Sequence, residues 1–236
     1  MKRINNLQLL LLALALAFAS CQSAGKLQKE QASQWVALFN GKNLEGWRIF
    51  RNKPSDSWEV KDGLLHCKGS RIDKSDRRGD LLSIGEYENF ELRVDWKISP
   101  AGNSGIMYLV TEQDDAAYKT GPEYQLIDDK GFPAKLENWQ RTGANYAMNP
   151  PTSYPANPAG EWNETRILVR HGHVEHWLNG VPVVQYELWT PEWEKNRQSG
   201  KWKDAPLYGR SRKGHICLQD HGSEAWFRNI EIKVLD

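Results

Sequence analysis

The sequence lacks a long hydrophobic run and an excess of charge of either sign. Its most hydrophobic segment, residues 9–18, has ten residues, whereas a helix needs roughly 20 to span a bilayer. The formal net charge is +1 over 236 residues, which gives no electrostatic attraction to nucleic acid. We therefore expect neither a membrane-spanning protein nor one that binds nucleic acid.

The short hydrophobic run has the surroundings of an export signal. Basic residues precede it, and small residues follow it directly before Cys21, which is the order of a basic start, an apolar centre and a cleavage site. We expect residues 1–20 to be a lipoprotein signal peptide and Cys21 to carry the lipid. A plain secretory signal with an incidental cysteine is the alternative. Residues 21–33 are mostly polar or small and fit a flexible tether.

Cysteine is scarce in the rest of the chain. Besides Cys21, only Cys67 and Cys217 are present, and export would allow a disulfide between them to persist. Each lies in a short apolar stretch with strand character, so two separately buried thiols are the favoured interpretation.

Two stretches predict strands most clearly. Residues 58–67 indicate a hairpin, because strand-forming segments flank an Asp62-Gly63 pair that favours a tight turn. Residues 90–98 alternate without a break between apolar and charged side chains. One face of this strand should meet a core, and the other should meet water or a ligand.

Further segments predict strands, whereas helix signals are few. The pairs 171–172 and 179–180, each ending in glycine, should join three strands as a meander. The only predicted helix follows Thr190 and Pro191, a cap residue and a first-turn proline. The further strands are residues 105–110, 124–127, 166–170, 173–178, 181–188, 215–220 and 227–235.

Many short alternating strands need a second sheet to cover their apolar face. We therefore predict that residues 34–236 form one all-β domain, a sandwich of two antiparallel sheets with at most one or two short helices. The segment from about residue 129 to 160 is rich in Pro, Gly and Asn and is long for a connection. Such loops are usually functional, so we expect it to form a wall of a binding site.

Aromatic residues are abundant and favour carbohydrate as a ligand. Eleven Trp and eight Tyr exceed what a core demands, and their rings stack on the C–H faces of sugars, with ~0.5–1.5 kcal/mol per contact as for aromatic pairs. Tryptophans inside predicted strands are assigned to packing. The better candidates for ligand contact lie in or beside loops: Trp139, Tyr146, Trp162, Trp189 and Trp193.

Two polar pairs have spacings that point to chemistry. Alternation places Glu123 and Gln125 on one face of a strand, and Gln219 and His221 on one face near the end of another. Histidine titrates nearest neutrality, so His221 is a candidate acid or base. A retaining glycosidase needs two carboxylates roughly 5 Å apart, and the strand offers Glu123 no partner. A solvated polar face and a structural histidine remain open alternatives.

A cluster of histidines near residue 173 invites a metal-site interpretation. His171, His173, Glu175 and His176 flank a tight turn and match no familiar spacing of metal ligands. We do not expect this cluster to bind a metal.

Several short motifs occur along the chain in a fixed order. They are residues 38–47 (LFNGKNLEGW), 103–106 (NSGI), 121–125 (GPEYQ), 161–163 (EWN), 177–180 (WLNG), 218–222 (LQDHG) and 227–230 (FRNI). The series resembles the 3-keto-disaccharide (3-keto-glycoside) hydrolase family, long described as a domain of unknown function and common in Bacteroidetes lipoproteins. The resemblance covers nearly all of residues 35–236. It implies a concanavalin-like jelly-roll sandwich and cleavage of glycosides already oxidised to a ketone at C3.

The implied chemistry suits the polar residues. A C3 ketone acidifies the hydrogen on C2, so one base removes it, an enolate forms, the C1 substituent leaves and water adds. This route needs a base, a stabiliser of the enolate oxygen and a proton donor, but no matched carboxylates. We assign Glu123 and His221 as base and acid, in either order, as a hypothesis that fits this chemistry. The side chains expected to bind hydroxyls or the keto oxygen are Asn103, Gln125 and Gln219.

The cation that stabilises the enolate is left open at this stage. Arg93, Lys213 or a bound divalent metal would each serve, and Tyr146 and Trp162 are the aromatic residues expected at the sugar. Two other functions compete with this one. A non-catalytic carbohydrate-binding sandwich would bind glycan without forming product, and a conventional glycoside hydrolase would need a second carboxylate about 5 Å from Glu123.

Residues 22–26 contain no acidic run of the kind that accompanies surface display in Bacteroidetes lipoproteins. We therefore expect the domain to face the periplasm and to touch the membrane only through its lipid. Cys21→Ala should abolish incorporation of a radiolabelled fatty acid, and protease added to intact wild-type cells should leave the domain uncut. Continued labelling of the variant would contradict lipidation, and digestion of the domain would place it on the cell surface.

Overall fold

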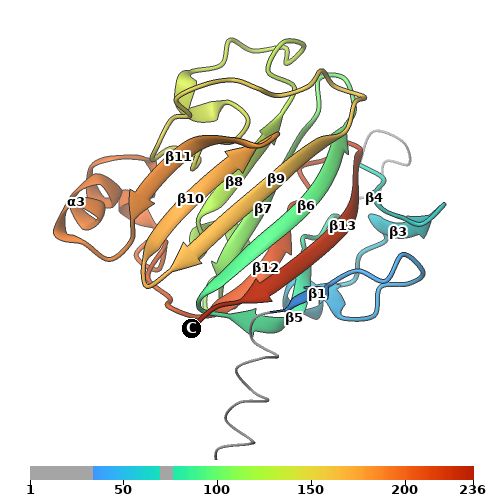
Figure 1. Cartoon of the computed structure of the whole chain (residues 1–236), viewed down its shortest axis with the longest axis horizontal. Helices are drawn as coiled ribbons and strands as arrows, with labels where there is room; N and C mark the ends of the chain where they lie inside the picture. Colours follow the sequence, from blue (N-terminus) through green and yellow to red (C-terminus); the bar gives the residue numbers. More distant parts are fainter. Residues whose placement is uncertain (1–33, 70–76) are drawn as a thin grey trace, which may run out of the picture.

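The computed structural model describes residues 34–69 and 77–236, which form two packed antiparallel sheets (Figure 1). The predicted signal peptide, the lipidated Cys21 and the tether lie outside the described residues. The strands are β1 (Trp35–Ala37), β2 (Trp47–Ile49), β3 (Trp58–Lys61), β4 (Leu64–Cys67), β5 (Leu81–Tyr87), β6 (Phe90–Ile98), β7 (Asn103–Val110), β8 (Glu123–Ile127), β9 (Asn163–Arg170), β10 (His173–Leu178), β11 (Val181–Glu187), β12 (Gly214–Leu218) and β13 (Ala225–Val234).

The larger sheet has eight strands in the order β11-β10-β9-β6-β13-β4-β3, with β1 also paired to β13. The smaller sheet has five, in the order β2-β5-β12-β7-β8. The predicted jelly-roll sandwich of two antiparallel sheets is confirmed. Its short helical segments are α3 (Pro191–Ser199) and the 3-10 turns η1 (Phe50–Asn52), η2 (Ala117–Lys119), η3 (Asn138–Gln140) and η4 (Lys201–Asp204). Among the described residues, no helix is both long and apolar enough to cross a membrane.

The strongest local signals of the sequence correspond to elements of the structure. β3 and β4 pair as a hairpin around the Asp62-Gly63 turn, and β6 alternates between buried and less buried residues along its length. β9, β10 and β11 form the predicted meander. α3 begins as expected, because the Thr190 hydroxyl accepts a hydrogen bond from the Trp193 backbone N–H at 3.1 Å.

Three strands gave no usable signal in the sequence. β1 and β2 have three residues each, which is too short to show a period. In β5, Glu86 pairs with His215 and Leu82 with Cys217, so four residue steps on β5 face two on β12. This irregular register breaks the alternation that would have predicted β5.

The five-stranded sheet is covered on both faces. The main core lies between the two sheets and receives, among others, Tyr124 and Leu126 of β8. A smaller apolar cluster covers part of the opposite face and contains Phe50, Leu82, Met107, Val110, Ala117 and Cys217. Cys67 and Cys217 are both buried and free, as predicted. Because both faces are covered, every residue of β8 is buried, including its polar ones.

Part of the histidine cluster has a structural role. His176 is fully buried, and its Nδ1 donates to the Gly143 carbonyl at 2.9 Å. Its Nε2 is therefore the acceptor for the Tyr108 hydroxyl at 2.7 Å, and the Tyr108 oxygen accepts in turn from the Tyr186 hydroxyl. Burial lowers the pKa of His176 to about 4, so the ring is neutral at physiological pH. In the part of the chain that the structure describes, no group of three or more His, Cys, Asp or Glu side chains is placed to hold a metal ion.

Candidate active site

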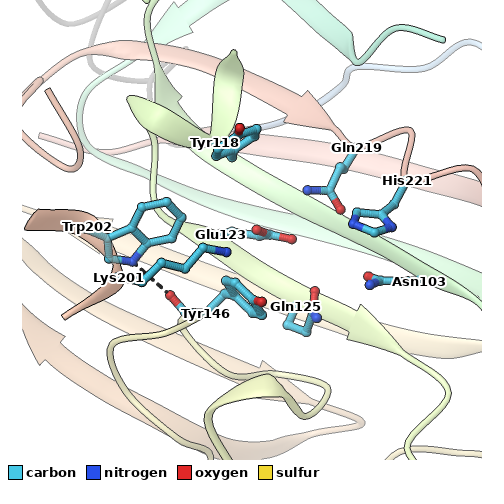
Figure 2. A pocket seen from close by; sticks show the side chains of 9 residues that line it. All are labelled: Asn103, Tyr118, Glu123, Gln125, Tyr146, Lys201, Trp202, Gln219 and His221. Carbon is cyan, nitrogen blue, oxygen red and sulfur yellow. Dashed lines mark hydrogen bonds between the residues drawn. The ribbon is translucent and has the colours of Figure 1, made fainter. Parts of the chain in front are cut away.

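A pocket of about 290 Å³ opens on the face of the five-stranded sheet that is turned away from the main core (Figure 2). Strands β7 and β8, the turns η2 and η4, the long loop 129–160 and the segment after β12 all contribute to it. Its lining residues are Asn103, Tyr118, Glu123, Gln125, Tyr146, Lys201, Trp202, Gln219 and His221.

β8 supplies the acidic group at the centre of the pocket. The predicted alternation holds, because Tyr124 and Leu126 point into the core while Glu123 and Gln125 line the pocket. Glu123 is 4% exposed. With its amide oriented to satisfy its hydrogen bonds, Gln125 donates to Glu123 Oε1 at 3.2 Å. Gly105 of β7 pairs with Gln125 of β8, and a Cβ at Gly105 would clash with Glu123 Oε1. Glycine at this position therefore makes room for the carboxyl group.

The segment after β12 brings Gln219 and His221 to the same pocket. The Gln219 backbone is held on both sides, because its N–H donates to the Gly105 carbonyl at 2.9 Å and its carbonyl accepts from the Ser104 hydroxyl at 2.8 Å. His221 is exposed at the pocket. Both side chains line one pocket, as predicted, but the predicted strand 215–220 is too long: β12 ends at Leu218, so the segment after the strand brings them together and strand alternation does not.

Two aspartates hold the backbone that carries His221. Asp80 accepts from the Asp220 backbone N–H at 2.9 Å. The Asp220 carboxylate accepts from Gly79 N–H at 3.2 Å and from Gly222 N–H at 3.0 Å. These reciprocal bonds tie the segment around His221 to the residues just before β5, so the imidazole is presented by a restrained turn.

The opposite wall is aromatic and cationic. Tyr146 comes from the long loop predicted to form a wall, and Lys201 and Trp202 come from η4 (Figure 2). The Trp202 indole N–H donates to the Tyr146 carbonyl at 3.2 Å, and its ring stacks on Tyr208 with centroids 4.1 Å apart. Lys201 Nζ lies 4.2 Å from the centroid of the Tyr146 ring.

Arg197 of α3 keeps this wall in place. It is 4% exposed and donates to the carbonyls of Trp202 and Ala205, each at 3.1 Å. The carboxylate of Glu194 pairs with its guanidinium at 2.8 Å. The backbone of η4 is thus bonded to a buried, charge-balanced side chain.

Burial of Glu123, and partial loss of water around the His221 ring despite its exposed edge, give these two groups complementary protonation states. Loss of water raises the pKa of Glu123 from 4.5 to about 8; Asp80 raises it further, while Lys201 and a hydrogen bond from Gln219 lower it. Loss of water also lowers the pKa of His221 below 6.5, with Arg78 and Lys201 acting in the same direction. At neutral pH, Glu123 therefore holds a proton and His221 is able to accept one.

Two amide oxygens in the pocket have no donor. Asn103 Oδ1 and Gln219 Oε1 are buried and make no hydrogen bond with any described residue. A buried acceptor without a donor costs about 1–3 kcal/mol. Both side chains line the pocket, so a ligand with hydroxyl groups would supply the donors that they lack.

The structure does not bring Arg93, Lys213 or Trp162 to this pocket. Arg93 belongs to the larger sheet and stacks on Trp35. Lys213 precedes β12, whereas Gln219 follows it, so the whole strand separates Lys213 from the site. The ring of Trp162 is contacted by two cations, Lys97 and Arg228, whose strands also belong to the larger sheet. For Arg93, the pattern within its strand carried no information about which sheet the strand joins.

The other aromatic candidates lie around the site or beside α3. Trp139 is 37% exposed and meets Tyr146 edge-on, with centroids 5.5 Å apart. Trp193 is buried between Tyr186 and Tyr208, and it lines a separate pocket with Trp189.

Sequence reasoning missed Tyr118, Lys201 and Trp202. They lie in the short 3-10 turns η2 and η4, where no periodicity assigns a side chain to a face. The available signal was composition, a Lys-Trp pair directly after the predicted helix.

Comparison with known proteins places the chain in a family. The model of the family described as "3-keto-alpha-glucoside-1,2-lyase-like domain" matches residues 34–233. The chain belongs to this family. A relative, the 3-keto-disaccharide hydrolase of Bacteroides thetaiotaomicron, is 36% identical over 231 residues, which cover 87% of this chain and 80% of the relative.

Solved structures agree with the assignment to the 3-keto-alpha-glucoside-1,2-lyase-like family. A proposed glycosyl hydrolase of Parabacteroides distasonis matches with a TM-score of 0.78 and 42% identity, over 86% of this chain and 94% of that one. A second one from the same organism matches with a TM-score of 0.66 and 30% identity, over 86% of this chain and all of that one (100%). The chain is therefore an enzyme with a glycoside hydrolase-like function.

Gly105→Ala tests the packing around Glu123. The added methyl group would displace the carboxyl group from its place, so we expect the variant to fold and to lose at least tenfold in kcat. The matched control is Gly200→Ala, because Gly200 has a φ of −112° and a Cβ there would meet only the Asn196 carbonyl, at an ordinary contact distance of 3.6 Å. Both glycines can be compared in the same assay and by thermal unfolding. Wild-type activity in a folded Gly105→Ala variant would contradict this role.

Proposed function

We propose that the enzyme cleaves glycosides whose sugar carries a ketone at C3, by removing the C2 proton, eliminating the C1 substituent and adding water. The observation that carries this proposal is the pairing, in one pocket, of a buried carboxyl with a raised pKa and a histidine with a lowered pKa. The substrate named in the Bacteroides relative, a 3-keto-disaccharide, supports the same class. An oxidised oligosaccharide or other glycoside is the proposed substrate.

His221 takes the role of base in this proposal. Its neutral imidazole accepts the proton from C2, which the neighbouring ketone makes acidic. The electron pair of the C2–H bond forms a double bond between C2 and C3, and the keto oxygen becomes an enolate. General-base assistance of this kind contributes about 10²–10⁴-fold.

Glu123 takes the role of acid. As the enolate collapses back to the ketone, the bond from C1 to the leaving oxygen breaks, and that oxygen takes the proton from Glu123. The product is a conjugated enone. Water then adds at C1, Glu123 recovers a proton from it, and His221 returns its proton to C2. Both side chains end as they began, and the net reaction is hydrolysis.

The remaining lining residues fit an oxidised sugar ring. The unpartnered oxygens of Asn103 and Gln219 would accept from its hydroxyls. The rings of Tyr146 and Trp202 offer apolar surface for its C–H face. Figure 2 shows the amide side chains and His221 on one side of Glu123 and the aromatic residues with Lys201 on the other.

A conventional retaining glycosidase fits the pocket less well. Among the described residues, Glu123 is the only carboxylate that lines it. Asp80 is near enough to raise the pKa of Glu123, but its carboxylate is bonded to the Asp220 backbone. The double displacement lacks its second free carboxylate.

The site of action is a further part of the proposal. We place the enzyme in the periplasm, tethered by a lipid on Cys21, where imported glycosides of small size would reach the pocket. Cys21 lies outside the described residues, so this part rests on the N-terminal sequence.

The roles of His221 as base and Glu123 as acid are tested with a glucoside and its 3-keto form as substrates, each with and without a chelator. We expect only the keto form to be cleaved. Glu123→Gln and His221→Ala should each lower kcat at least about 10²-fold. The wild-type profile of kcat/KM against pH should be bell-shaped, falling below pH 6.5 as His221 gains a proton and above about pH 8 as Glu123 loses one.

Other outcomes would overturn specific parts of the proposed function. Cleavage of the unoxidised glucoside would indicate a conventional hydrolase, and binding without product would indicate a carbohydrate-binding module. Activity lost with the chelator and restored by a divalent metal would assign the stabilising charge to that ion. Full activity in both variants would remove Glu123 and His221 from the reaction.

A further inference from the structure

Lys201 occupies an unusual position in the pocket. Its ammonium is held by two ring faces, with Nζ 4.2 Å from the Tyr146 centroid and 4.9 Å from the Trp202 centroid. In Figure 2, the nitrogen is directed toward Glu123. Within the described residues, no carboxylate forms an ion pair with it. Cation–π contacts of this kind contribute about 0.5–2 kcal/mol and leave the outward side of the ammonium free to donate.

The charges around the pocket favour an anion at this position. With Glu123 protonated and His221 neutral, Lys201 is the only charged side chain among the described residues that line the pocket. The charged groups that act from behind the lining include one cation, Arg78, and two anions, Asp80 and Asp220. The positive charge of Lys201 is therefore the one that a ligand in the pocket meets directly, and an anionic oxygen formed beside it would pair with it.

The position of Lys201 is also fixed before any ligand binds. It begins η4, whose backbone carbonyl at Trp202 is bonded to the buried Arg197. Its aromatic neighbours are bonded to one another, because Trp202 donates to the Tyr146 carbonyl. A charge that is held in place before the reaction stabilises the transition state without the cost of rearranging solvent.

We propose that Lys201 is a catalytic residue, whose ammonium donates to the C3 oxygen of the substrate and stabilises the enolate formed there. The inference rests on the proposed function. It assigns to Lys201 the role of the cation that stabilises the enolate, which the sequence analysis left open. During the step, the C2 proton moves to His221, the C2–H electron pair forms the C2–C3 double bond, and the carbonyl π pair moves onto the oxygen beside Lys201. Lys201 keeps its own protons and forms no covalent bond.

Two substitutions and one control test this role. Lys201→Met should lower kcat about 10²–10³-fold, the loss typical of removing one donor to an oxyanion, with a much smaller change in KM. Lys201→Arg keeps the charge and should retain at least a tenth of the activity. Lys203→Met removes an exposed lysine from the same turn and should behave as the wild type.

Exchange of the C2 hydrogen with deuterated water isolates the enolate step. In Lys201→Met, the exchange rate of a 3-keto-glucoside, followed by NMR, should fall in the same proportion as kcat. Lys201 also lowers the pKa of both Glu123 and His221. Removing its charge should therefore move both limbs of the pH profile upward, while Asp80, Arg78 and Asp220 continue to act on the two groups. Substitution of a lysine with only a structural role would leave both limbs of the pH profile unchanged.

The outcomes separate this inference from the proposed function. A wild-type enzyme that neither exchanges nor cleaves the keto substrate would overturn both. Cleavage by the wild type together with less than threefold loss in Lys201→Met would overturn the role of Lys201 alone. An inactive Lys201→Arg variant, with a borohydride-trapped adduct on the wild-type lysine, would replace charge stabilisation by a covalent Schiff base.

Discussion

The burial of one carboxyl group sets the protonation state of the candidate active site. Glu123 points from a strand whose residues are all buried, into a pocket closed by the long loop and η4. Loss of water raises its pKa to about 8, and the opposing charge of Lys201 offsets only part of that effect. A carboxyl group that is protonated at neutral pH can serve as an acid, which an ordinary glutamate with a pKa of 4.5 cannot do.

This burial has a consequence for stability. The pKa of Glu123 is higher in the folded state than in the unfolded chain. Its contribution to the free energy of unfolding is therefore fully present below about pH 4.5 and is lost as the pH rises to about 8. The folded state must therefore keep the Glu123 carboxyl group buried, although its ionised form would be more stable in water. Gly105 supplies the space, and the side chains that line the pocket leave Glu123 only 4% exposed.

The rest of the pocket is built by side chains that never face it. Asp80 and Asp220 restrain the turn that carries His221. Arg197 restrains the turn that carries Lys201 and Trp202. The catalytic groups on the two sides of Glu123 thus stand on separately anchored segments, which suits a reaction in which proton transfer and charge stabilisation must coincide in space.

Much of this arrangement could be predicted from the sequence, and the limits have physical causes. Strict alternation predicted β6 and the shared face of Glu123 and Gln125, because a strand has a period of two regardless of its surroundings. Lys201 and the strand β5 escaped prediction, since a 3-10 turn and an irregular register have no such period. Which sheet Arg93 would join depends on long-range pairing, and no local pattern encodes it.

The most direct test is the titration of the Glu123 carboxyl carbon by NMR in uniformly ¹³C-labelled protein, with the resonance assigned by its absence in Glu123→Gln. Burial in the pocket predicts a midpoint about pH 8. A midpoint near 4.5 would show that the group is ionised at neutrality, and it would contradict the role of Glu123 as the acid of the reaction.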